Sequence, residues 1–134
     1  MMTQPEILLK TADLPWVPII EGIDFKLLRA SSETGTWSVI FKAKKGSFFP
    51  AHKHFGAGEY LMLKGRMEYR VGVAVEGDYG YEPIDSIHEM TTFTEDSELL
   101  FTNHGVVLFL NEDGTYGEAL DYKYVADLAA QHLK

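Results

Sequence analysis

The stretch GSFFPAHKHFGAGEYLMLKG, residues 46–65, contains two histidines, His52 and His54, that are separated by a single lysine. Side chains of an extended strand alternate between its two faces, so both imidazoles are expected on one face. Two such imidazoles can chelate one metal ion at about 2.0–2.1 Å each. A His-x-His pair also occurs in exposed loops, so the pair alone leaves a metal site and a solvated loop as equal alternatives.

The residues around this stretch form a series of short segments that are typical of β-strands. They are rich in β-branched and aromatic residues, several alternate in polarity, and glycines separate them. The segments are 23–28, 36–44, 59–65, 66–72, 78–83 and 98–103. Close spacing without helical patterns between them favours an all-β sandwich or barrel. Only residues 122–133 show helical spacing, which predicts a short C-terminal helix on the outside of the barrel or on a partner subunit.

The composition limits the classes of function. The chain has 134 residues, which is the length of one domain, so we expect a single domain over 1–134. Cysteine is absent, which excludes disulfides and a thiolate metal site. The formal net charge is −8, and this argues against a nucleic-acid partner because phosphate binding depends on Lys and Arg.

The sequence contains no membrane or export signal that we can identify. Its apolar runs are far shorter than the roughly 18–20 residues that cross a bilayer. The opening MMTQPEILLK lacks the basic start and the long apolar stretch of a signal peptide. We therefore expect a cytoplasmic protein with no membrane partner.

Residues 46–65 resemble the first sequence motif of the cupin family, and GDYGYEPIDSIHEMT, residues 77–91, resembles the second. The second motif runs from a glycine through a proline to the third ligand histidine of the family, which falls on His88. The resemblance implies a single-domain cupin, which is a jelly-roll (double-stranded β-helix) barrel, with one divalent metal ion. The metal ligands that it implies are His52, His54 and His88.

Most metal-binding cupins add a glutamate ligand three or four residues after the second histidine, and Glu59 lies near that position. However, the strand that leads to Gly65 is one residue shorter than in the usual pattern. Counting back from Gly65 places the ligand position on Gly58, and alternation then turns Tyr60 and Met62 inward and Glu59 outward. We predict a three-histidine site without Glu59, with Glu59 as a fourth ligand as the alternative. Three neutral imidazoles leave the ion its double charge and favour an anionic ligand that binds through two oxygens.

A more specific resemblance covers PAHKHFGAGEYLMLKGRMEYRVG (50–72), DYGYEP (78–83) and HEMTTF (88–93). These segments resemble the acetylacetone-cleaving dioxygenases, which are three-histidine, non-haem iron(II) cupins that split a carbon–carbon bond of a β-dicarbonyl compound with dioxygen. DLPWVP (13–18) is also similar to the dihydroxyacetophenone dioxygenases. Both families are close to the cupin domains of zinc-binding anti-sigma factors. The implied cofactor is Fe(II), with Zn(II) or Ni(II) as alternatives.

The resemblance also implies roles for residues near the metal. The polar residues beside the iron in that family fall on Tyr60, Arg70, Glu82 and Thr91. The walls of the substrate pocket fall on Phe49, Met62 and Phe101. An Arg–Glu pair next to a cationic centre could hold water and orient ligands. Without the resemblance, the aromatic residues would be interpreted as core and the Arg–Glu pair as an outer-face ion pair of small energetic value.

The resemblance implies a dioxygenase that acts on a small anionic, oxygen-chelating substrate. The alternative is a zinc-binding sensor or regulatory module without redox catalysis, although no N-terminal helical segment is evident that could grip a sigma factor. A third possibility is a metal-assisted hydrolase or isomerase with Glu82 or Glu59 as a general base. We also expect a homodimer or homotetramer, with the segment IDFKLL (23–28) as a candidate contact.

Overall fold

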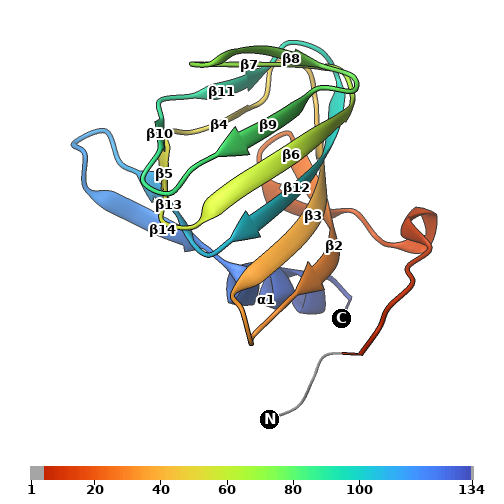
Figure 1. Cartoon of the computed structure of the whole chain (residues 1–134). Helices are drawn as coiled ribbons and strands as arrows, with labels where there is room; N and C mark the ends of the chain where they lie inside the picture. The colour runs from red at the N-terminus through yellow and green to blue at the C-terminus, as the bar shows by residue number, and fades with distance from the viewer. Residues whose placement is uncertain (1–4, 134) are drawn as a thin grey trace.

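The computed structural model describes residues 5–133, which form fourteen antiparallel strands in three sheets, one 3-10 helix and one α-helix (Figure 1). The six-stranded sheet has the order β1 (Val17–Ile20), β2 (Ile23–Ala30), β3 (Thr36–Ala43), β12 (Ser97–His104), β6 (Ala57–Lys64) and β9 (Tyr79–Glu82). The second sheet consists of β10 (Ile87–His88), β5 (His52–His54), β13 (Val107–Leu110) and β14 (Tyr116–Leu120). The third sheet consists of β4 (Phe48–Phe49), β11 (Thr91–Phe93), β7 (Arg66–Tyr69) and β8 (Gly72–Val75). The predicted all-β architecture is confirmed.

Strand alternation builds the core between these sheets. In β3, buried and half-buried residues alternate strictly along the strand, as the period of two requires. Its inward side chains pack with those of β2, β12 and β11 into one apolar cluster. Deeply buried large residues of this cluster include Phe25, Trp37, Val39, Phe41 and Phe93. Figure 1 shows the strands arranged around this interior.

The hydrogen-bonded sheets do not close into one continuous barrel, and this differs from the barrel that the sequence predicts. The chain changes sheets between Phe49, which pairs with Thr91 of β11, and His52, which pairs with Phe109 of β13. Pro50 lies at this change of sheet and has no N–H to continue a ladder. The jelly-roll arrangement therefore consists of facing sheets that share a core rather than one closed sheet.

The predicted C-terminal helix is present as α1 (Tyr122–His132). Asp121 caps it, because its carboxylate accepts a hydrogen bond from the backbone N–H of Tyr124 at 2.8 Å. Val125 is fully buried where α1 packs against β2 and β1 on the outside of the six-stranded sheet. A second short helix, η1 (Thr11–Asp13), lies in the N-terminal segment. Among residues 5–133, no helix is long and apolar enough to span a bilayer.

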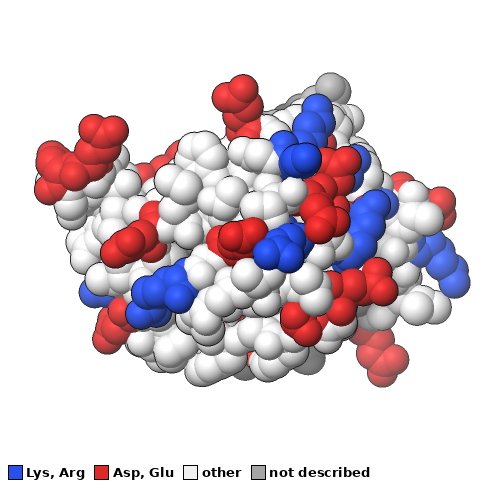
Figure 2. Space-filling view, turned by 90° about the horizontal axis from the view of Figure 1, so that it is seen from above, with Lys and Arg blue, Asp and Glu red and all other residues white. Residues whose placement is uncertain are grey.

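Charged side chains of both signs are interspersed on the molecular face that Figure 2 shows. On this face the basic residues stand beside acidic ones and do not form an extended basic patch. This distribution agrees with the acidic balance of the sequence, although it concerns one face only.

Candidate metal centre

Three buried histidines meet at the junction of β5 and β10. The two histidines of β5 share one face, as the His-x-His spacing predicts, and β10 pairs antiparallel to β5 with His88 directly opposite His52. The ring centroids of the three imidazoles are 5.1, 5.1 and 5.2 Å apart. Their exposed fractions are 7%, 1% and 2% for His52, His54 and His88. Residues from two separate motifs thus form one compact cluster.

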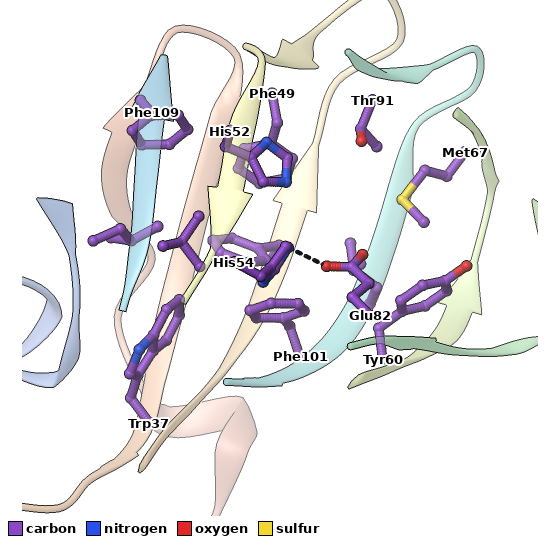
Figure 3. A pocket seen from close by; sticks show the side chains of 14 residues that line it. Trp37, Phe49, His52, His54, Tyr60, Met67, Glu82, Thr91, Phe101 and Phe109 are labelled. Atoms are coloured by element: carbon purple, nitrogen blue, oxygen red, sulfur yellow. Dashed lines mark ion pairs between the residues drawn. The ribbon is translucent and has the colours of Figure 1, made fainter. Parts of the chain in front are cut away.

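A carboxylate completes the cluster, and it comes from the end of β9. An oxygen of Glu82 contacts Nε2 of His54 and lies 3.9 Å from Nε2 of His88. One potential ligand atom from each of these residues and from His52 lies within 4.8 Å of the other three. Figure 3 shows the His54–Glu82 contact, with the rings of His52 and His54 turned into the same pocket as Glu82. The metal-ligand chemistry of this group is therefore three imidazoles and one carboxylate.

Gly58 explains why the glutamate of the usual cupin pattern is absent from β6. A Cβ at Gly58 would lie 2.9 Å from Oδ1 of Asn103 and 3.2 Å from Cε1 of His54, so the position faces the cluster but has little free space. Glu59 points the other way, and its side chain is 41% exposed and 3.9 Å from Nε2 of His104. The predicted outward orientation of Glu59 and inward orientation of Tyr60 are confirmed. The register of β6 and β9 places Glu82 opposite Gly58, so a carboxylate lies beside the three imidazoles, while the three-histidine ligand set without Glu59 stays a prediction.

Comparison with known proteins identifies the family. The sequence model described as the ChrR cupin-like domain matches residues 4–108. The chain belongs to this cupin family. It is 36% identical over 116 residues to the acetylacetone-cleaving enzyme of Acinetobacter johnsonii, covering 78% of this chain and 76% of that enzyme.

This cupin is similar in structure to an acetylacetone dioxygenase and to part of an anti-sigma factor complex. The structure of an acetylacetone dioxygenase from Acinetobacter johnsonii superposes with a TM-score of 0.90 at 30% identity, covering 98% of this chain and 95% of that one. The complex of Rhodobacter sphaeroides SigE with the anti-sigma factor ChrR gives a TM-score of 0.62 at 19% identity, covering 70% and 51% respectively. The second likeness concerns the fold alone. Together these comparisons confirm the predicted cupin jelly roll.

The electrostatics of the cupin's cluster suit a divalent cation. Burial lowers the pKa of His52 to about 4, although the hydrogen bond from its Nδ1 to the carbonyl of Pro50 opposes this shift. Burial likewise lowers the pKa of His88. Burial by itself would raise the pKa of Glu82, but the contact with His54 and the neighbouring imidazoles outweigh it and lower that pKa. At neutral pH His52 and His88 are therefore neutral and the carboxyl is ionised, which are the protonation states that bind metal.

The cluster opens into a mostly apolar pocket between the sheets of the cupin (Figure 3). Five of the residues predicted to surround the metal line this pocket: Phe49, Tyr60, Glu82, Thr91 and Phe101. The remaining walls are apolar side chains from β3, β7, β12, β13 and β14. They are Trp37, Phe41, Met67, Leu99, Val107, Phe109 and Leu120.

Two predicted site residues lie elsewhere. Met62 is buried in the core one inward position beyond Tyr60 and does not line the pocket, where Met67 stands instead. Arg70 is exposed in the turn after β7, because that strand ends at Tyr69. The expected pair between Arg70 and Glu82 is not formed in the described part of the chain. Arg70 acts only at longer range, where its positive charge contributes to the lowered pKa of His88.

Two residues next to the cluster were missed by the sequence analysis. The ring of Tyr69 stacks on His88 with centroids 5.5 Å apart, and its hydroxyl is 2.7 Å from the hydroxyl of Tyr60. Asn103 is fully buried, and its Oδ1 lies 3.2 Å from Nδ1 of His54. The sequence contains one signal for Asn103. It is a polar residue at an inward position of a strand whose other inward positions include the apolar Leu99 and Phe101.

Proposed function

We propose that this cupin is a non-haem iron(II) dioxygenase that cleaves a carbon–carbon bond of a small β-dicarbonyl or hydroxyketone substrate. The observation that carries the proposal is the buried group of three imidazoles and one carboxylate at the wall of an apolar pocket. The likeness to an acetylacetone-cleaving enzyme and to an acetylacetone dioxygenase supports the same reaction class.

The residues present fit a divalent ion held by His52, His54 and His88, with Glu82 beside it. The potential ligand atoms lie within 4.8 Å of one another, and Nε2 of His88 is buried without a hydrogen-bond partner among the described residues. Neutral imidazoles with a carboxylate suit Fe(II), and also Zn(II) and Ni(II). When bound, iron(II) would supply open positions for two substrate oxygens and an electron donor toward dioxygen.

The protein's own side chains supply binding and proton transfer. The aromatic and aliphatic walls, such as Phe49, Phe101 and Phe109, exclude water and limit the size of the substrate. The ionised carboxylate of Glu82 faces the cluster and can accept the proton that a dicarbonyl loses on enolisation. Tyr60 and Thr91 line the same pocket, and a hydroxyl is a group that can donate a hydrogen bond to a substrate oxygen.

Dioxygen consumption tests this function directly. The protein is reconstituted anaerobically with Fe(II), mixed with a panel of β-dicarbonyl compounds and hydroxyketones, and followed by oxygen uptake and product analysis. We expect uptake of one dioxygen for each substrate molecule that is cleaved into two products, and its loss in His54→Ala. His104→Ala is the matched control, because His104 is exposed and lies outside the cluster. Absence of uptake with every compound of the panel would reject the proposal.

A second candidate is a zinc-binding regulatory module without redox activity. The match to the ChrR cupin-like domain favours it. Elemental analysis of protein from unsupplemented medium separates the two candidates. Tightly held zinc, together with no oxygen uptake after iron reconstitution, would favour the regulatory module.

The assembly and the cellular location remain predictions from the sequence. A homodimer or homotetramer is expected, and light scattering after gel filtration measures it. The cytoplasmic location is tested by fractionation of the source cells.

A further inference from the structure

We propose that Asn103 is a positioning residue that fixes the tautomer of His54, so that Nδ1 carries the proton and Nε2 is free for a metal ion. This inference rests on the proposed metal site, although its central observable can be measured without metal. The starting point is a row of four residues across the six-stranded sheet. Paired registers align Trp37, Asn103, Gly58 and Glu82 on four neighbouring strands.

The ring of His54 is held along this row. Its Nδ1 lies 3.2 Å from Oδ1 of Asn103, and its Nε2 contacts the carboxylate of Glu82. Gly58 stands between these two residues in the row, and its missing side chain leaves the space that the ring needs. The two nitrogens of His54 therefore face different residues, one on each side of Gly58.

The hydrogen bonds determine how the amide of Asn103 is oriented. Its Nδ2 donates to the carbonyl oxygen of Gly105 at 2.8 Å, and Nε1 of Trp37 donates to the same oxygen at 2.9 Å. A carbonyl oxygen only accepts hydrogen bonds, so turning the amide over would place two acceptors against each other. Oδ1 of Asn103 must therefore face His54.

An oxygen acceptor at Nδ1 requires a proton on that nitrogen. When the neutral ring binds a metal ion, its lone pair then lies on Nε2, which points into the cluster. In the metal-free protein the same nitrogen faces the carboxylate of Glu82, which is a hydrogen-bond acceptor. The amide thus selects the one tautomer of His54 that can bind a metal ion at the centre. Because Asn103 is fully buried, no bulk water is available to replace its hydrogen bond.

The three histidines differ in how their tautomers are controlled. Nδ1 of His52 donates to the carbonyl of Pro50 at 2.8 Å, and a side-chain substitution cannot remove that backbone group. Neither ring nitrogen of His88 has a hydrogen-bond partner within residues 5–133. His54 is therefore the histidine of the cluster whose tautomer depends on a neighbouring amide side chain.

The test combines nitrogen-15 NMR of histidine-labelled protein with zinc affinity from chelator competition. Zinc is the probe because it is diamagnetic. In the wild-type protein, metal-free or zinc-loaded, we expect a proton on Nδ1 of His54. In Asn103→Leu we expect that proton to be lost from part or all of the population, and zinc affinity to fall about 10- to 100-fold. Asn103→Asp keeps an oxygen acceptor and should keep the proton on Nδ1, at a cost in stability because its second oxygen faces the carbonyl of Gly105.

Thr102→Val is the matched control on the same strand. It removes a hydrogen bond to Ser38 of 2.8 Å on the opposite face of β12 and should leave zinc affinity unchanged. An unprotonated Nδ1 of His54 in the wild-type protein would overturn the proposal. So would a loss of zinc affinity in Asn103→Leu with Nδ1 still protonated, since that result indicates a packing role. If Asn103→Leu does not fold, the nitrogen-15 spectra of the wild-type protein and of Asn103→Asp still test whether Nδ1 of His54 carries a proton.

The two proposals fail in distinguishable ways. If wild-type protein binds no divalent metal, the proposed function fails, while the Nδ1 signal of metal-free His54 still tests Asn103. If metal binds and oxygen is consumed but Nδ1 of His54 is unprotonated, only the role of Asn103 fails.

Discussion

Gly58 lies directly opposite Glu82 in the antiparallel pair of β6 and β9. The glycine occupies the place at which the usual cupin pattern has a glutamate, and the carboxylate reaches the histidines from the next strand instead. The cluster thus retains a negative charge beside the imidazoles. Substitutions at Gly58 and Glu82 therefore test how this pair shapes the cluster.

Gly58→Ala should disturb the metal centre more than the fold. The added Cβ would approach Oδ1 of Asn103 to 2.9 Å and Cε1 of His54 to 3.2 Å. One of these side chains must move, at a cost of about 1–3 kcal/mol of unfolding free energy. We expect zinc affinity to fall by at least about tenfold, as when a residue that orients a ligand is altered. Chelator competition and urea unfolding measure the two effects, and unchanged zinc affinity would contradict this account of Gly58.

Glu82→Gln and Glu59→Gln form a matched pair of substitutions. Each removes one negative charge with little change in size, but only Glu82 contacts the cluster. We expect Glu82→Gln to lower the rate of oxygen uptake about 10²-fold or more if its carboxylate accepts the substrate proton. Glu59→Gln should behave like wild type. If Glu59→Gln lowers the rate of oxygen uptake strongly and Glu82→Gln does not, the result would favour the alternative in which Glu59 is a metal ligand.

The metal-free protein should lose stability as the pH falls from 6.5 toward 4. The folded-state pKa of His52 is lowered to about 4 from an ordinary 6.5, so the unfolded chain binds more protons across this window. The contribution of His52 is fully present above pH 6.5 and is reduced by about 3 kcal/mol at pH 4. The lowered pKa values of His88 and Glu82 act in the same direction.

Urea unfolding at pH 4, 5, 6 and 7 measures this dependence. The comparison protein is His52→Gln, which keeps a polar side chain but cannot titrate. If His52→Gln loses as much stability as the wild-type protein between pH 7 and pH 4, His52 is not the main source of the pH dependence.

Phe109→Ala should widen the substrate range. Phe109 lines the pocket, and its ring centroid lies 6.1 Å from that of His52. If the proposed activity is present, its truncation should allow bulkier β-dicarbonyls and lower their KM relative to the smallest compound of the panel, at a cost of about 3 kcal/mol in stability. Phe55→Ala is the control, because Phe55 is largely exposed and packs on Tyr116 away from the pocket. An unchanged ratio of KM values would argue against Phe109 as a wall that selects substrates.

Strand periodicity made a large part of this structure predictable. It gave the all-β architecture and the C-terminal helix, and it gave the shared face of the His-x-His pair and the outward orientation of Glu59. These properties follow from alternation or helical spacing within one segment, which the local sequence specifies. The third histidine required the family resemblance, since it belongs to a separate motif.

Other features were decided by contacts between distant segments. The register of β6 against β9 and β12 brings Glu82 and Asn103 to the two nitrogens of His54, and it cannot be read from any one strand. The end of β7 at Tyr69 leaves Arg70 exposed, although the resemblance placed it by the metal. Alternation along a strand determines which face of the sheet a side chain lies on, whereas the pairing of strands determines which side chains contact one another. The sequence by itself therefore determined the histidine pair, and the family resemblance placed Glu82 near the metal. Only the tertiary structure showed that Glu82 contacts His54 and that the amide of Asn103 faces the other nitrogen of this ring.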